Sequence, residues 1–168
     1  MMASEGARLE FELILEALNR REVQYVVIGS VAALVQGAPL VRTLDVDVTP
    51  AGDPENKQRL ALALVDVEAR LRAPGLADPM KIPLDEGTFS GMTTMTFATR
   101  HGPLDLCFMP EGTSGYEDLS KDALPIEING IEFRVASIAD IVRSKKAAGR
   151  EKDAAHVEIL SDLLEGRP

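Results

Sequence analysis

The sequence lacks tryptophan and has only two tyrosines and five phenylalanines in 168 residues. A folded core of this composition must therefore consist mainly of aliphatic side chains. The single cysteine, Cys107, cannot form an internal disulfide, which is typical of a protein kept in a reducing compartment. The sequence shows no signal peptide and no apolar run long enough to span a bilayer. We therefore expect a cytoplasmic protein with no membrane contact.

Acidic residues outnumber basic ones and give the chain a formal net charge of −9. This charge argues against a protein that coats nucleic acid without sequence preference. A local basic patch nevertheless lies between residues 134 and 152, where only Asp140 and Glu151 oppose the positive charges. The patch is either a solvated helix face or the binding surface for an anion. Its basic residues are Arg134, Arg143, Lys145, Lys146, Arg150 and Lys152.

The chain length suits a single domain over residues 1–168, with a core over about 8–135 and a C-terminal helical segment over about 136–165. Apolar periodicity and caps predict helices over 8–21, 31–35, 137–148 and 151–164, and one after Asp53-Pro54. The buried stripe expected for that helix is Leu60, Leu64, Val67 and Leu71. Alternation and turn signals predict strands over 24–28 and 44–49, and hairpins over 93–109 and 125–135. This order predicts an α+β or mixed α/β fold, in which helices flank a mixed sheet and two helices end the chain.

Two aspartates alternate with apolar residues in the segment Leu44-Asp45-Val46-Asp47-Val48. Alternate side chains of a strand share one face, so Asp45 and Asp47 are expected to point the same way. Leu44, Val46 and Val48 are then expected to face the core. Aspartate is unfavourable in strands, so two in one strand indicate a function.

A third aspartate, Asp105, lies in the similar segment Leu104-Asp105-Leu106. If its strand neighbours the first one, three carboxylates converge and raise one another's pKa unless a cation lies among them. One or two Mg²⁺ ions, held by carboxylates and by substrate phosphates, would suit such a cluster. The alternative is that these acids are solvent-facing residues of half-exposed strands.

A small-residue turn, Gly29-Ser30, follows the apolar strand expected over residues 24–28. Glycine allows a close approach of the backbone to a ligand, and the N–H groups at the start of a helix suit a phosphate. Ser30 either adds a hydroxyl donor or caps the helix. A Gly-Ser pair alone also fits an ordinary turn, so its value comes from its position before the acidic pair.

Taken together, these segments resemble the DNA polymerase β-type nucleotidyltransferase superfamily, in which Gly-Gly or Gly-Ser precedes Asp-x-Asp/Glu and a third acid follows on a later strand. Within it, the chain looks most like the small bacterial AbiEii-type proteins, several of which are toxins of type IV toxin–antitoxin systems. The similarity spans about residues 23–160. The segments that carry it are Ile28-Gly29-Ser30, Arg42-Thr43-Leu44-Asp45-Val46-Asp47, Leu104-Asp105-Leu106 and the stretch from Asp140 through Lys145 and Arg150 to Asp153.

The resemblance implies a minimal nucleotidyltransferase fold and a role for each matching residue. Asp45, Asp47 and Asp105 would be the catalytic and Mg²⁺-binding acids, and Asp105 would act as base or as metal ligand for the incoming hydroxyl. The other matching positions would bind the NTP substrate. These positions are Gly29, Ser30, Arg42, Thr43, Lys145, Arg150 and Asp153, with Lys146 as an alternative to Lys145.

Three functions are compatible with the sequence. The first is a toxin-like nucleotidyltransferase that modifies RNA, such as tRNA, or a protein, with a cognate antitoxin as partner. The second modifies a small hydroxylated molecule such as an antibiotic, and the acidic net charge favours it slightly over the first. The third is a catalytically idle module that binds a nucleotide or a partner. The nucleobase preference, the acceptor and the oligomeric state stay open.

Overall fold

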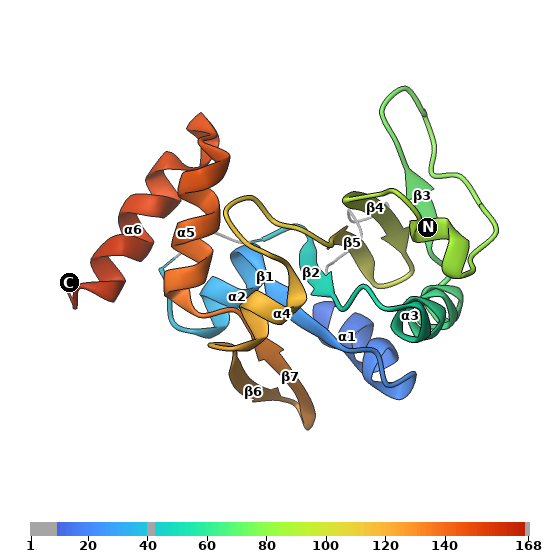
Figure 1. Ribbon diagram of the computed structural model, residues 1–168, viewed down its shortest axis with the longest axis horizontal. Helices are drawn as coiled ribbons and strands as arrows, with labels where there is room; N and C mark the ends of the chain where they lie inside the picture. The colour runs from blue at the N-terminus through green and yellow to red at the C-terminus, as the bar shows by residue number, and fades with distance from the viewer. Residues whose placement is uncertain (1–9, 40–42, 167–168) are drawn as a thin grey trace, which may run out of the picture.

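A computed structural model describes residues 10–39 and 43–166 of the chain. Seven strands form one mixed sheet in the order β3-β4-β5-β2-β1-β7-β6 (Figure 1). In the centre of the sheet, β1 is antiparallel to β2, β2 is parallel to β5, and β1 is parallel to β7. The strands are β1 (Tyr25–Ile28), β2 (Val46–Pro50), β3 (Arg70–Arg72), β4 (Thr94–Thr99), β5 (Gly102–Cys107), β6 (Leu124–Ile128) and β7 (Ile131–Val135).

Helices flank this sheet, and α5 and α6 pack against each other at one end of the molecule (Figure 1). The predicted α+β architecture is therefore confirmed. The helices are α1 (Phe11–Arg20), α2 (Gly29–Val35), α3 (Pro54–Asp66), α4 (Tyr116–Ser120), α5 (Ile138–Ala148) and α6 (Ala154–Leu164), with 3-10 turns η1 (Glu86–Phe89) and η2 (Glu151–Asp153). No helix within the described ranges is both long enough and apolar enough to cross a membrane.

The core is mainly aliphatic, as the composition predicts. Leucine, isoleucine and valine supply most of the largest fully buried side chains, and Phe89 and Phe97 are the aromatic exceptions. Val46 and Val48 of β2 pack next to Leu104 and Leu106 of β5, and all four are fully buried. Burying these side chains, at about 1.5–3 kcal/mol each, stabilises the parallel pair that carries the acidic residues on its other face.

Local sequence signals place several element ends correctly. The Asp53 carboxylate accepts a hydrogen bond from the Asn56 amide and caps α3, whose first residue is Pro54. Asn129 and Gly130 both have positive φ angles and join β6 to β7, as the Asn-Gly signal predicts. The Ser137 hydroxyl accepts from the Asp140 amide and caps α5.

Several predictions at the ends of elements are wrong in detail. Leu44 does not face the core: it is 69% exposed, because β2 begins only at Val46. Leu71 lies in β3 and not in the stripe of α3, which ends at Asp66. The short strand β3 and the five-residue helix α4 were not predicted, since each is too short to show a period. The first two residues of the helix expected over 8–21 lie outside the described residues.

Candidate active site

The three aspartates expected to form a metal site converge in the structure. Asp47 of β2 stands directly opposite Asp105 of β5 in the parallel register, and Asp45 immediately precedes β2. Each of the three offers a carboxylate oxygen that lies within 4.8 Å of the other two. The condition for convergence, that the two acidic strands are neighbours, is therefore met in the structure.

This arrangement is electrostatically costly without a cation. Burial and the adjoining Asp105 raise the pKa of Asp47 to about 8, and the charge of Asp45 adds to the effect. The same two main causes raise the pKa of Asp45 to about 6. The Oδ1 atom of Asp105 is buried and accepts no hydrogen bond from the residues that the structure describes. An oxygen-rich, under-satisfied cluster of this kind fits a hard divalent cation such as Mg²⁺.

Gly29 lies against this cluster. Its φ angle is +69°, a left-handed conformation that side chains disfavour, and a Cβ atom at this position would collide with Oδ2 of Asp47. Gly29 and Ser30 are the first two residues of α2, whereas the sequence predicts them in a turn before the helix. Glycine is therefore needed here for the conformation of the strand–helix junction and for the position of the Asp47 carboxylate.

A basic group faces the acids from α5 and η2. The Lys145 ammonium lies 3.4 Å from Asp153 Oδ1, and the Arg150 guanidinium donates to Asp153 Oδ2 over 2.7 Å. Asp153 is only 6% exposed. Burial alone would raise the pKa of Asp153, but Lys145 and Arg150 outweigh it and hold that pKa below its usual value. Lys145 is also close enough to Asp47 to favour ionisation of that carboxyl.

A cleft of about 820 Å³ joins these groups. It is lined by Gly29, Ser30 and the three aspartates, and also by Lys145, Arg150, Lys152 and Asp153. The sites predicted separately from the two halves of the sequence therefore line one cavity. Lys146 is exposed and does not line the cleft, so the geometry distinguishes it from Lys145.

The remaining predicted site residues are placed differently. The Thr43 hydroxyl donates to the backbone carbonyl of Asp45, 2.9 Å away, and so braces the segment before β2. Arg42 lies outside the described residues. Within the basic patch, Arg134 donates to the carbonyls of Ser120 and Ala123 and does not face the cleft.

Sequence reasoning missed other residues that line the cleft. The loop after β5 contributes residues 109–113 to its lining, and Asp140 of α5 also borders it. The signal in the sequence is weak, because Pro110, Gly112 and Gly115 indicate only a loop. Its approach to α5 depends on contacts between residues far apart in the chain.

Comparison with known proteins identifies the fold. No family model and no curated protein sequence matches the chain. Among solved structures, a candidate nucleotidyltransferase from Thermotoga maritima is 18% identical, with a TM-score of 0.57 over 98% of this chain and 100% of the other. The lincomycin-bound lincosamide antibiotic adenylyltransferase LnuA is 15% identical, with a TM-score of 0.61 over 93% and 98% of the two chains.

A third solved structure is similar to this chain over most of both lengths. ANT(2")-Ia in complex with adenylyl-2"-tobramycin is 17% identical, with a TM-score of 0.57 over 90% of this chain and 85% of the other. Identities this low establish a common fold and leave the activity to be argued from the site. The chain therefore has the nucleotidyltransferase fold.

Proposed function

We propose that the protein is a Mg²⁺-dependent nucleotidyltransferase, which transfers a nucleoside monophosphate from an NTP to a hydroxyl group and releases pyrophosphate. The convergence of Asp45, Asp47 and Asp105 within 4.8 Å, in a cleft that also contains Lys145, is the observation that carries the proposal. The similarity in fold to two adenylyltransferases supports the same class of reaction.

Each group in the cleft has a role in this reaction. Asp45, Asp47 and Asp105 would hold one or two Mg²⁺ ions, which when bound neutralise phosphate charge and polarise the α-phosphate. The backbone at Gly29 and Ser30 would bind the triphosphate together with Lys145, while Arg150 and Asp153 hold the Lys145 ammonium in place. Arg42 and Thr43 are proposed to complete the nucleotide site.

The chemical step is a displacement at the α-phosphorus. The acceptor oxygen forms a bond to phosphorus, the bond to the bridging oxygen of pyrophosphate breaks, and the acceptor proton passes to Asp105 or to solvent. The attacking and leaving oxygens lie roughly in line, so positioning and charge stabilisation supply most of the rate enhancement.

For the acceptor we propose RNA, such as tRNA, or a protein, in the manner of the AbiEii-type toxins, with an antitoxin as partner. The basic residues Lys145, Arg150 and Lys152 in one cleft support an anionic ligand there. The second candidate is a small hydroxylated antibiotic. The similarity in fold to LnuA with lincomycin and to ANT(2")-Ia with adenylyl-2"-tobramycin favours it.

One labelling experiment tests the reaction and the acceptor together. The protein is incubated with Mg²⁺ and the four NTPs, each labelled at the α-phosphate, and separately with total bacterial RNA, lysate protein, lincomycin and tobramycin. We expect label on one class of acceptor and release of pyrophosphate. Asp47→Asn should reduce the transfer by at least about 100-fold, because it removes a charged metal ligand.

Equal transfer by the wild type and Asp47→Asn would contradict the mechanism. A protein that binds Mg²⁺ and NTP but labels nothing and releases no pyrophosphate would be an idle binding module.

A further inference from the structure

Residues 109–113 of the loop after β5 also line the cleft, and we call them the 109–113 wall. This loop leads from β5, the strand of Asp105, towards α5 and then into the short helix α4 (Figure 1). Internal hydrogen bonds shape it: the Thr113 hydroxyl and amide both donate to the Pro110 carbonyl, over 2.8 and 3.1 Å. These bonds define the form of the loop, but they do not hold it against α5.

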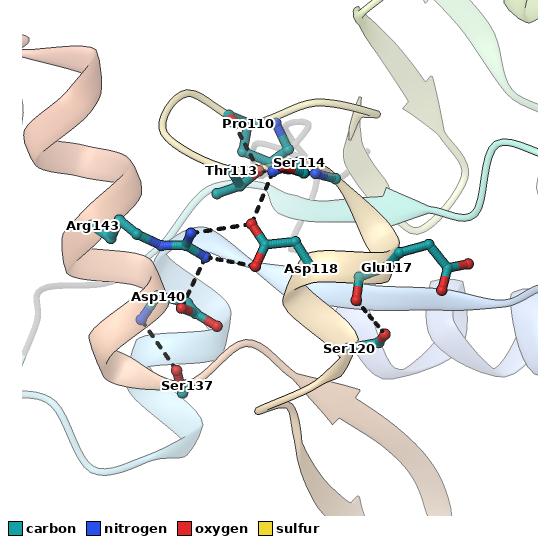
Figure 2. Close-up of polar contacts among 10 residues, drawn as sticks. Pro110, Thr113, Ser114, Glu117, Asp118, Ser120, Ser137, Asp140 and Arg143 are labelled. Carbon is teal, nitrogen blue, oxygen red and sulfur yellow. Dashed lines mark hydrogen bonds and ion pairs between the residues drawn. The ribbon is translucent and has the colours of Figure 1, made fainter.

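Arg143 of α5 makes that connection (Figure 2). Its guanidinium donates to both carboxylate oxygens of Asp118 in α4, over 3.1 and 3.2 Å, and to Oδ1 of Asp140 over 3.0 Å. Oδ2 of Asp118 also accepts from the Ser114 amide over 2.9 Å. The hydrogen bond from Arg143, with that from the Ser114 amide, holds the pKa of Asp118 below its usual value. One arginine therefore joins α5, α4 and the end of the loop.

The loop fits closely against α5 at Gly112. A Cβ atom built there would lie 2.7 Å from Cβ of Ala147 and 3.2 Å from the carbonyl oxygen of Arg143. The φ angle of Gly112 is +74°, so a larger residue would also be strained. Backbone contact and the Arg143 bridge thus fix the loop on the same helix that carries Lys145.

The proposed in-line displacement indicates which substrate the 109–113 wall would contact. In the proposed reaction the triphosphate would be bound by Lys145, and the acceptor would approach the α-phosphate past Asp105, in line with the leaving pyrophosphate. The wall continues the strand of Asp105 through Cys107 and Met109, both of which line the cleft. Met109, Pro110, Gly112 and Thr113 are uncharged and suit an organic acceptor better than a phosphate, and Glu111 is the one charged member of this set.

We infer that Arg143 is a positioning residue, which holds the 109–113 wall against α5 and so places the acceptor for attack at the α-phosphate. The inference rests on the proposed function, whose acceptor side it defines. Arg143 itself does not line the cleft. It acts through Asp118 and Asp140, and we expect its loss to leave Lys145, Arg150 and Asp153 in place, because their contacts do not involve Arg143.

The test separates transfer to an acceptor from transfer to water. Pyrophosphate release is measured with Mg²⁺ and the four NTPs, with and without a clarified bacterial lysate that supplies RNA, proteins and small hydroxyl compounds. For Arg143→Gln we expect the lysate-dependent release to fall by about tenfold, mainly through a higher lysate concentration at half-maximal rate. Release with water as acceptor and the KM for NTP should stay within about twofold of the wild type.

Two further variants check the geometry of the bridge. Asp118→Asn should reproduce the effect of Arg143→Gln, and the double variant should lose little more than either one, because both changes break the same contact. Arg143→Lys should recover only part of the rate, since lysine cannot form the two-pronged contact with Asp118.

Arg21→Gln is the matched control. Arg21 forms an equivalent two-pronged pair with Asp66, over 2.7 and 2.9 Å, that ties α1 to α3 away from the cleft. Its loss breaks the same kind of two-pronged ion pair as the loss of Arg143 but should leave both rates unchanged. Amide hydrogen exchange over residues 111–115 should speed up in Arg143→Gln and not in Arg21→Gln.

Several results would overturn the inference. A loss of both rates in Arg143→Gln would make the arginine merely structural, and a loss of neither, even with faster exchange in the loop, would remove the wall from the reaction. If lysate did not change pyrophosphate release by the wild type, no acceptor would bind at the 109–113 wall and the inference would be wrong. A wild type that releases no pyrophosphate under any condition would refute the proposed function itself, and the inference with it.

Discussion

Gly29 shows how one residue connects the backbone to the chemistry of the site. It has no side chain at a point where any side chain would meet the Asp47 carboxylate, and its backbone is left-handed. The position of the Asp47 carboxylate therefore depends on the absence of a Cβ atom at Gly29. A substitution at Gly29 is expected to act on the metal site as well as on the backbone.

Gly29→Ala can be tested against Gly37→Ala. Gly37 also has a positive φ angle, +92°, but a Cβ there would meet nothing within 4 Å. Both variants should lose about 1 kcal/mol of stability from the strained backbone. Only Gly29→Ala should also displace Asp47 and reduce the rise in melting temperature caused by Mg²⁺. Thermal unfolding with and without Mg²⁺ measures both effects, and an equal response to Mg²⁺ in the two variants would contradict this account.

Among the elements, the junction of α5, η2 and α6 sets the position of the basic group. Gly149 ends α5 in a left-handed conformation, and its amide donates to the Lys145 carbonyl. The chain then turns so that Asp153 comes back to Lys145 and Arg150. Two adjacent lysines are thus distinguished, because the Lys145 side chain is only 11% exposed and pairs with Asp153, whereas Lys146 is exposed.

Lys145→Met and Lys146→Met test this distinction. Lys145→Met should weaken the binding of a non-hydrolysable NTP with Mg²⁺ by about tenfold, since it removes a charge-assisted contact with phosphate. Lys146→Met changes the net charge equally and should have little effect. Calorimetric titration measures both affinities. If the two variants bound the nucleotide equally well, Lys145 would have no place in the site.

At the scale of the whole molecule, the acidic cluster makes the free energy of unfolding depend on pH. Asp45 and Asp47 have pKa values of about 6 and about 8 in the folded protein, both raised above the ordinary aspartate value of 3.8. The folded state therefore binds their protons more tightly than the unfolded state. This contribution to stability is complete below about pH 4 and is lost as the pH rises towards 8.

Without metal, the protein should be less stable at pH 8 than at pH 5, and these two groups should account for up to about 5 kcal/mol of the difference. Mg²⁺ should restore most of the loss at pH 8. Asp47→Asn should make the metal-free protein more stable at pH 8 and less responsive to Mg²⁺. Chemical denaturation in the presence of a chelator, and then with Mg²⁺, measures these values. A metal-free wild type as stable at pH 8 as Asp47→Asn would show that the carboxylates do not repel one another as described.

Features set by near neighbours in the chain could be predicted from the sequence. The turn at Asn129-Gly130 and the caps at Asp53 and Ser137 depend on residues within one turn, and the structure contains all three. Helix α4 could not be predicted in this way. It spans only five residues, and it is held by an arginine far along the chain.

The sequence by itself determined which residues are candidates for the chemistry, because the alternation of Asp45 and Asp47 in a strand and the glycine after an apolar strand are local patterns. Only the tertiary structure decided that β2 and β5 are parallel neighbours with Asp47 opposite Asp105. It also decided that Arg143 turns to Asp118 while Lys145 faces the cleft. These pairings join segments that are distant in the chain. They depend on the packing free energy of the whole core, which cannot be derived from a short window of sequence.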